Sequence, residues 1–338
     1  MTAPSRTSGD VRRGAWAVAG PLGGALVLAV LVWLLGTEPF RAGVRGLRPG
    51  TLLAAVAVGA VTTVCSAWRW RVVVRALGSD LRLPTATAAY YGSQFLNCTL
   101  PGGVLGDVHR GLRNGVDCGD AGRGIRAVVW ERTAGQVVLA VLALGVLLTL
   151  PSPVEDVVPV LALAAAGTAA LVATAGGVAV RWVPAGVARV VRTMAGEARA
   201  GMLAPAVLLS SAVVCVGYVG MFLLAAGAVG VEASAVQLLP LAVIVLIGAA
   251  IPLNLGGWGP REGVAAWSFA AAGWTAVEGV AVATAFGVLT LVSVLPGAAL
   301  LLVGRRLRPT GRAARDKRDL QEHHVAHSGA REDGAARG

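Results

Sequence analysis

The sequence predicts an all-α protein that folds as a polytopic bundle of membrane helices. Its 338 residues are 56% hydrophobic and only 14% charged, and the mean hydropathy is +0.71. An average soluble domain carries about 25% charged residues, so this chain has too few polar side chains to cover a soluble fold. The composition therefore excludes a soluble enzyme, a nucleic-acid-binding protein and a disordered chain, and we expect no nucleic-acid partner.

Six segments approach or reach the length of about 20 mostly apolar residues that a membrane-spanning helix needs. The first is too long for the apolar region of a signal peptide, so we expect it to be retained as a helix. The second reaches Val74 if the apolar pattern is extended past two arginines. The six predicted spans are 15–35, 51–67, 127–150, 157–180, 203–229 and 279–303.

Two further apolar regions, 85–107 and 238–273, are interrupted by proline and glycine. Proline removes a backbone hydrogen-bond donor, and glycine loosens a helix. A broken backbone at membrane depth is tolerated only where protein or a wet cavity shields it. We therefore predict two re-entrant hairpins, each made of two half-helices. The residues predicted to break them are Pro101, Gly102, Gly103, Pro252, Gly256, Gly257, Gly259 and Pro260.

The arginines predict the orientation in the membrane. With the N-terminus inside, segments 1–14, 68–84, 107–126, 181–202 and 304–338 are cytoplasmic, and they hold 24 of the 29 basic residues. The predicted outer loops 151–156, 230–236 and 274–278 hold none. This positive-inside pattern indicates the cytoplasmic membrane, with both chain termini in the cytoplasm. One predicted outer loop, 36–50, carries three arginines and would fit the pattern as an interfacial helix.

The chain divides into a cytoplasmic tail (1–14), a membrane domain (15–307) and a basic tail (308–338) that we expect to be disordered. Residues 15–150 and 151–307 follow the same order of helix, helix, hairpin and helix, but they begin on opposite sides. This is an inverted-topology repeat, an arrangement common in secondary transporters. Three histidines in the last segment are read as part of a solvated tail, and we expect no metal site.

Polar side chains cluster at the hairpins and in the third predicted span. Charge inside a membrane is costly, so such residues are candidates for function. Helix N-termini bind anions, and arginine is well suited to grip phosphate. We therefore predict a polar, anion-binding site near the middle of the membrane. Its predicted residues are Asn97, Asp107, Arg110, Glu131, Arg132, Asn254, Arg261 and Glu262.

Each charged pair also has a purely structural explanation. Asp107 and Arg110 have the i,i+3 spacing of a local ion pair. Arg132 could mark the membrane boundary, with its side chain reaching outward. Glu262 could simply complement the dipole of a helix that begins at Pro260.

The motifs around these residues resemble those of the lysylphosphatidylglycerol synthase transmembrane family, also called the flippase-like domain family. The first runs from Gln94-Phe95-Leu96-Asn97 through Leu100-Pro101-Gly102-Gly103 to Gly106-Asp107-x-x-Arg110. The second is Glu131-Arg132-x-x-Gly135, in which the family more often has Asp at the first position. The third joins Ile251-Pro252 and Gly256-Gly257-x-Gly259 to Arg261-Glu262-Gly263.

The resemblance implies a helical bundle with re-entrant segments that moves or presents lipids. We expect a translocator for an anionic phospholipid or a polyprenyl-phosphate-linked lipid, without a cofactor. In bifunctional relatives a separate soluble domain of a few hundred residues makes the lipid. We expect no such synthase activity here, and a separately encoded transferase would then be a partner.

Two other functions stay open. In a membrane-embedded transferase, Asp107, Glu131 or Glu262 would act as general base. In an accessory subunit of a cell-envelope enzyme, the tryptophans Trp258, Trp267 and Trp274 would form a partner face, although interfacial anchoring also explains them. The sequence also leaves open whether the chain forms a homo-oligomer.

Overall fold

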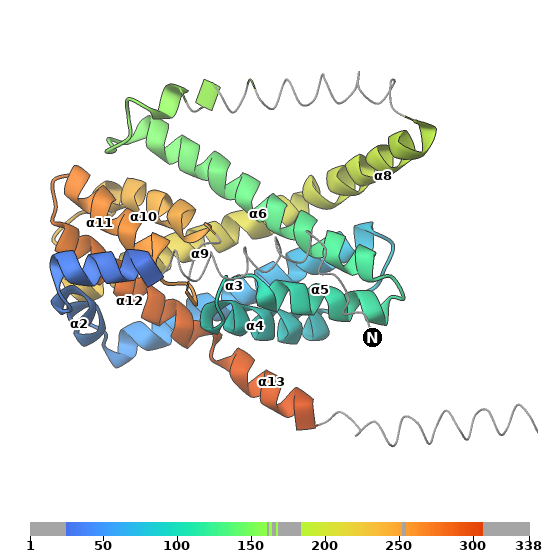
Figure 1. Cartoon of the computed structure of the whole chain (residues 1–338), viewed down its shortest axis with the longest axis horizontal. Coiled ribbons are helices and arrows are strands. Elements are labelled where there is room, and N and C mark those ends of the chain that lie inside the picture. Colours follow the sequence, from blue (N-terminus) through green and yellow to red (C-terminus); the bar gives the residue numbers. More distant parts are fainter. Residues whose placement is uncertain (1–24, 161, 164–166, 168–183, 252–254, 307–338) are drawn as a thin grey trace, which may run out of the picture. The chain divides into compact units, whose positions relative to one another are not determined.

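A computed structural model describes residues 25–160, 162–163, 167, 184–251 and 255–306. Within this part the secondary structure is helical, with isolated β-bridges but no β-strand. A first helix, Ala25–Leu35, is followed by the helices labelled in Figure 1. They are α2 (Glu38–Arg45), α3 (Pro49–Ala76), α4 (Leu83–Thr99), α5 (Leu105–Asp117), α6 (Ala121–Thr149), α8 (Ala185–Met202), α9 (Pro205–Val229), α10 (Ala235–Ala249), α11 (Pro260–Ala271), α12 (Ala276–Val294) and α13 (Pro296–Arg306).

Four described helices are long and apolar enough to cross a membrane: α3, α6, α9 and the stretch Ala276–Leu302. A fifth candidate is the pair Ala25–Leu35 and α2, which is bent by 98°. Large apolar side chains such as Trp33 and Leu53 are strongly exposed, as expected for helices surrounded by lipid. The chain is therefore a multi-pass membrane protein.

Four of the six predicted spans coincide with these long helices. The first predicted span, 15–35, is described only from Ala25 onward, and most of 157–180 lies outside the described residues. The described part thus contains four or five candidate spans, whereas the sequence predicts six.

Helix α3 extends well beyond the predicted span 51–67. Pro49 occupies its first turn, and the helix runs for 28 residues to Ala76 before Gly78 adopts a left-handed φ of 81°. Arg69, which the charge pattern placed in a cytoplasmic segment, lies inside this helix and is buried. The helix therefore passes Val74, the limit that the extended apolar pattern predicts, and the cytoplasmic side of 68–84 stays a prediction.

Both predicted hairpins are pairs of short helices with a break between them. The first break follows α4, and Gly102 and Gly103 have φ values of 87° and 62°. The second break follows α10, and Gly256, Gly257 and Gly259 have φ values of 60°, 87° and 118°. These left-handed conformations favour glycine, so the glycines suit the turns that lead from α4 to α5 and from α10 to α11.

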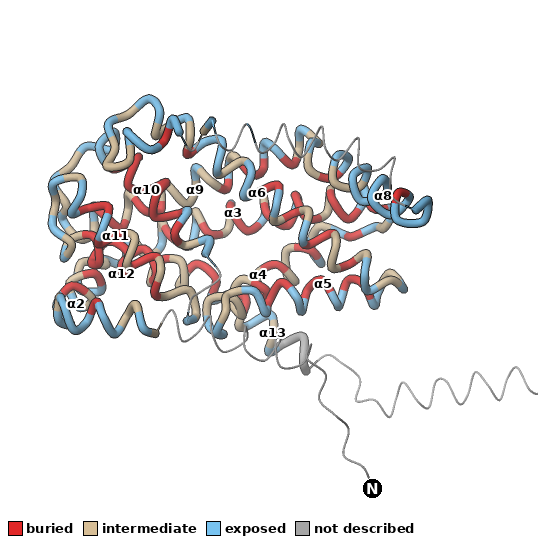
Figure 2. Tube along the Cα trace, turned by 45° about the horizontal axis from the view of Figure 1, so that its top comes forward, coloured by how far each residue is buried: buried red, intermediate tan, exposed pale blue. Residues whose placement is uncertain are grey.

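The helices around the breaks occur in the same order twice. A long helix, a shorter helix, a break, a short helix and another long helix follow one another in α3–α6 and again in α9–α12. The first set packs around Trp70, Val73 and Tyr90, and the second packs around Phe222, Phe269 and Phe286. The two sets meet where α3 and α9 pack side by side (Figure 2).

The loop with three arginines does contain a helix. In α2 one face is buried, and Gly43 lies so close to α12 that a Cβ atom there would be 2.5 Å from the carbonyl oxygen of Ala281. Arg41 and Arg45 are exposed. The amphipathic α8 stands at the corresponding place before α9 and exposes Arg189 and Arg192.

The chain separates into two compact units, Met1–Gly297 and Ala298–Gly338. All of the helices from α2 to α12 belong to the first unit. The predicted tails 1–14 and 308–338, with the three tail histidines, lie outside the described residues. The predicted domain limits therefore stay predictions.

Candidate anion-binding cavity

A cavity of about 300 Å³ lies between the two sets of helices. Residues from all the helices of the two sets, α3–α6 and α9–α12, line it, and so do both breaks, through Gly103 and Gly257. The charged residues of its lining are Arg69, Asp107, Arg132 and Arg261. Segments that are far apart in the sequence thus share one cavity, in which charged side chains lie among apolar ones.

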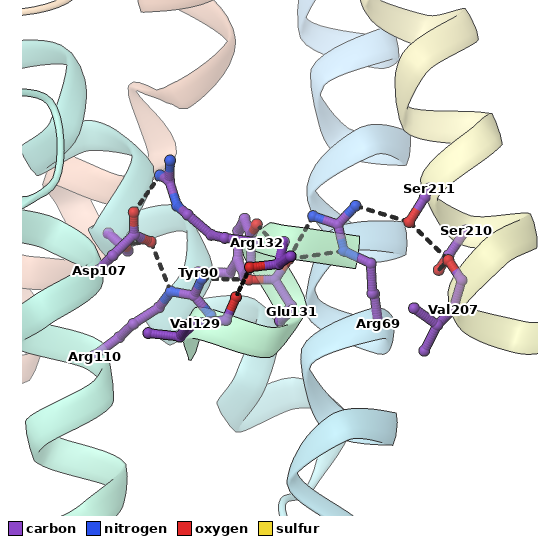
Figure 3. Close-up of polar contacts among 12 residues, drawn as sticks. Arg69, Tyr90, Asp107, Arg110, Val129, Glu131, Arg132, Val207, Ser210 and Ser211 are labelled. Carbon is purple, nitrogen blue, oxygen red and sulfur yellow. Dashed lines mark hydrogen bonds and ion pairs between the residues drawn. The ribbon is translucent and has the colours of Figure 1, made fainter. Parts of the chain in front are cut away.

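A buried network of charges supports one side of this cavity (Figure 3). Glu131 is fully buried, and its Oε1 accepts hydrogen bonds from Nε of Arg69 at 2.7 Å and from the hydroxyl of Tyr90 at 3.1 Å. Its other oxygen, Oε2, accepts from Nη2 of Arg110 at 2.5 Å. Arg69 also donates through Nη1 to the hydroxyl of Ser211, at 3.1 Å. One carboxylate therefore holds two arginines and links α3, α5 and α6.

Asp107 is a second acceptor in the network. Its Oδ1 accepts from the hydroxyl of Ser93 at 3.0 Å and from Nε of Arg110 at 2.9 Å. Its Oδ2 accepts from Nδ2 of Asn97 at 3.0 Å and forms an ion pair with Nη2 of Arg132. Oδ1 of Asn97 accepts a hydrogen bond from the backbone N–H of Gly106 at 2.8 Å, and this contact joins the end of α4 to the start of α5.

Arg110 is the most enclosed of these arginines. Its guanidinium lies 4.7 Å from the ring centre of Trp70 and 4.4 Å from that of Tyr90. Such cation–π contacts stabilise a guanidinium that is removed from water. Arg110 therefore contributes to the cavity indirectly, by holding Asp107 and Glu131 in place.

Arg261 and Glu262 form a separate pair at the start of α11. Nε of Arg261 donates to Oε1 of Glu262 at 2.9 Å, and Oε2 accepts the backbone N–H of Gly259 at 2.7 Å. The guanidinium lies 5.0 Å from the ring centre of Trp258 and 5.6 Å from that of Phe286. Glu262 thus caps its helix, as the structural explanation expects, and also orients an arginine at the cavity.

Two glycines provide the space that the cavity arginines occupy. A Cβ atom at Gly135 would lie 2.7 Å from Nη1 of Arg69, and one at Gly287 would lie 2.2 Å from Nη2 of Arg261. Gly135 is on α6 and Gly287 is on α12, which stand at corresponding places in the two sets of helices. The lack of a side chain at these positions lets each guanidinium lie against a neighbouring helix.

The two breaks contact each other. Pro101 and Leu255 form an isolated antiparallel β-bridge. Nearby, a Cβ atom on Gly256 would lie 3.1 Å from the carbonyl oxygen of Cys98. The ends of the two interrupted segments therefore meet at the cavity.

The structure brings most of the predicted site residues together. Asn97, Asp107, Arg132 and Arg261 line the cavity. The other charged residues, Arg110, Glu131 and Glu262, are buried as their partners. Asn254 and the break residue Pro252 lie outside the described residues. Among the described residues no group of His, Cys, Asp and Glu could hold a metal ion.

Sequence reasoning missed Arg69, whose importance appears only with its partner. Arg69 and Glu131 are 62 residues apart. The one available signal was the apolar pattern that continues past Trp68-Arg69-Trp70 to Val74. Tyr90, Ser93 and Ser211 were missed as well, because single hydroxyl groups in apolar helices have many ordinary roles.

The fold and the cavity define a multi-pass membrane protein with a buried arginine-rich site that spans two broken helix pairs. The chain belongs to the family described as lysylphosphatidylglycerol synthase TM region, whose model matches residues 20–297. This family ties the protein to the handling of membrane lipids. Comparison with curated proteins and comparison with solved structures each returned no match.

Proposed function

We propose that the protein translocates an anionic lipid across the cytoplasmic membrane. The headgroup passes through the cavity, while the hydrocarbon tails stay in the surrounding bilayer. The observation that carries this proposal is the cavity at the junction of the two breaks, lined by Arg69, Arg132 and Arg261. A phosphate group is the natural ligand for several guanidinium groups in a site partly removed from water.

Burial of these arginines makes sense if a headgroup passes between them. Side chains of Arg69 and Arg261 are each only 7% exposed, and each is paired with a buried carboxylate. The buried pairs hold the guanidinium groups in place before a ligand arrives. A preorganised site of this kind binds a phosphate with little rearrangement of its own side chains.

The broken helices support movement rather than simple binding. In this proposal, α4 with α5 and α10 with α11 are re-entrant hairpins that enter from opposite faces. The repeated order of helices fits an inverted-topology repeat, with the lipid site at its centre. A change in the contact between the breaks would then open the cavity alternately to the two faces. The lipid itself would come from a separately encoded transferase.

Reconstitution tests the proposal directly. Purified protein in phosphatidylcholine vesicles is given tail-labelled fluorescent phosphatidylglycerol, and the label left in the outer leaflet is measured with a membrane-impermeant quencher. We expect protein-dependent movement that falls about tenfold in Arg261→Ala, which corresponds to about 1.4 kcal/mol of lost interaction. The matched control is Arg123→Ala, because Arg123 is a half-buried residue in the first turn of α6 that lies outside the cavity lining.

The proposal fails if vesicles with correctly folded protein show no movement of any tested lipid beyond that in empty vesicles. If lipid moves and Arg261→Ala equals the Arg123→Ala control, the assignment of the cavity is wrong.

A further inference from the structure

Arg132 differs from the other arginines of the cavity network in its exposure. Its side chain is 42% exposed, whereas those of Arg69, Arg110 and Arg261 are 7%, 1% and 7% exposed. It lines the cavity, and the contact shown in Figure 3 is a single ion pair, from Nη2 to Oδ2 of Asp107. Arg132 can therefore leave Asp107 for another anion. Asp107 would still accept hydrogen bonds from Ser93, Asn97 and Arg110.

The charges of the network identify Arg132 as the surplus cation. Asp107 and Glu131 are both paired with Arg110, and Glu131 is also paired with Arg69. These four residues carry two positive and two negative charges. Arg261 and Glu262 form a second neutral set. Arg132 shares Asp107 with Arg110, so among the charged residues described at the cavity it adds one positive charge that no further carboxylate balances.

We propose that Arg132 is the residue that binds the lipid headgroup, and that the headgroup carries one phosphodiester charge with no ammonium group to offset it. This inference rests on the proposed function and specifies its substrate class. One phosphodiester neutralises the single surplus charge of the cavity. A phosphate monoester or diphosphate brings more negative charge than the site can balance.

In this proposal the carboxylates of the cavity offer little to a cationic headgroup. Asp107 already accepts from four donors, which are Ser93, Asn97, Arg110 and Arg132. Both oxygens of Glu131 are engaged by donors of the protein, and so are both oxygens of Glu262. When Arg132 turns to the headgroup, Asp107 keeps its other three donors, so an ammonium group would meet the positive charge of Arg132 without a donor-free carboxylate among the described lining residues. Like charges in a poorly solvated site repel strongly.

The experiment compares tail-labelled lipids that share their tails and differ in the headgroup and its charge, in the same vesicles. They are phosphatidylglycerol (one negative charge), phosphatidylethanolamine (zwitterionic), lysyl-phosphatidylglycerol (net positive) and phosphatidic acid (a monoester). We expect phosphatidylglycerol to move about tenfold faster than each of the others, since a charged hydrogen bond contributes an interaction of that order. Equal rates for phosphatidylglycerol and lysyl-phosphatidylglycerol overturn the inference while leaving the proposed function intact.

Two variants locate the selectivity. Arg132→Gln removes the surplus charge, and we expect it to abolish the preference for phosphatidylglycerol over phosphatidylethanolamine. Asp107→Asn removes one negative charge, so the net charge of the cavity becomes more positive by one. We expect this variant to shift the preference toward phosphatidic acid. Arg123→Gln, on the same helix and exposed to a similar degree but outside the cavity lining, is the control that keeps wild-type selectivity. Wild-type selectivity in Arg132→Gln contradicts the assignment.

A binding measurement separates this inference from transport. Water-soluble dihexanoyl-phosphatidylglycerol is added to the detergent-purified protein, and thermal unfolding is followed. Ligand that binds the folded state raises the unfolding temperature. We expect a rise in the wild type and in Arg123→Gln, and none in Arg132→Gln. Protein that binds this lipid but moves none would sink the proposed function only, whereas equal stabilisation of Arg132→Gln would sink the inference.

Discussion

The guanidinium of Arg69 occupies space that a side chain at Gly135 would need. A Cβ atom at Gly135 would come within 2.7 Å of Nη1 of Arg69, although the two residues lie on different helices. The atom that would have to move is the end of a flexible side chain rather than backbone. A methyl group here would thus displace a cavity arginine without altering any charge.

We expect Gly135→Ala to lower lipid movement about tenfold, equivalent to about 1.4 kcal/mol of lost interaction, while the protein stays folded. The measurement is the vesicle assay, with circular dichroism to check folding. Gly145→Ala is the matched control, because it lies on the same helix and its Cβ would meet nothing within 4 Å. Equal activity of the two variants would show that the position of Arg69 does not matter.

Gly287 should have the same role for Arg261. A Cβ atom there would lie 2.2 Å from Nη2 of Arg261. We expect Gly287→Ala to lower movement at least as much as Gly135→Ala does, because the clash is closer. Kinetic measurement at several lipid densities in the vesicle checks this. A variant that transports like the wild type would separate Arg261 from the transport path.

Removal of Glu131 should destabilise the fold. Glu131→Gln would leave Arg69 and Arg110 facing each other across a neutral group, and breaking a buried ion pair costs about 3–5 kcal/mol. We expect a lower unfolding temperature and a poor yield of monodisperse protein. The double variant Arg69→Gln/Glu131→Gln should recover part of the loss, because it removes a charge of each sign. A double variant less stable than the sum of the single changes would contradict this pairing.

Thiol labelling should distinguish the cysteines that line the cavity from a cysteine outside it. Cys98 and Cys215 line the cavity, whereas Cys65 does not. In single-cysteine variants we expect a small, charged methanethiosulfonate reagent to modify Cys98 and Cys215, and dihexanoyl-phosphatidylglycerol to slow this reaction. Cys65 should be unaffected by the lipid. Equal protection of all three thiols would indicate a general effect of the lipid on the protein.

Asp120 should make the stability of α6 depend on pH. Its Oδ1 accepts the backbone N–H of Arg123 at 2.9 Å, and this contact holds the pKa of Asp120 below its usual range. The ionised cap therefore stabilises the fold above about pH 3.9, the ordinary value for Asp, and this contribution is lost as the pH falls through the lowered pKa. Thermal unfolding between pH 3 and 6 checks this against Asp120→Asn, which keeps a capping side chain that does not titrate. Parallel pH curves for the two proteins would refute the assignment.

Sequence alone predicts those parts of the fold that depend on local backbone chemistry. The breaks near Gly102 and Gly256 were predictable because proline and glycine interrupt apolar helices wherever they occur. The helix in the loop 36–50 was predictable from its misplaced arginines. The role of Arg69 was not, since it depends on a carboxylate from another helix. A count of charges along the chain treats such an arginine as a loop residue.

The different surroundings of the arginines could not be predicted from the sequence either. Arg110 and Arg132 look alike in the motifs, yet one is stacked on Trp70 and Tyr90 while the other opens to the cavity. Only the packing of α3 and α4 around α5 creates this difference. Residue type predicts that an anion site exists, and burial decides which guanidinium can reach a ligand.

The bridge between Pro101 and Leu255 joins the two halves through main-chain atoms rather than through side chains. A seam of this kind places few demands on which amino acids occupy it, provided that the glycines beside it keep their turns. Side chains that line the cavity can accordingly be exchanged without removing this main-chain contact. If the protein moves lipids as proposed, changes aimed at its lipid preference should begin with Arg132 and its neighbours and leave the bridge untouched.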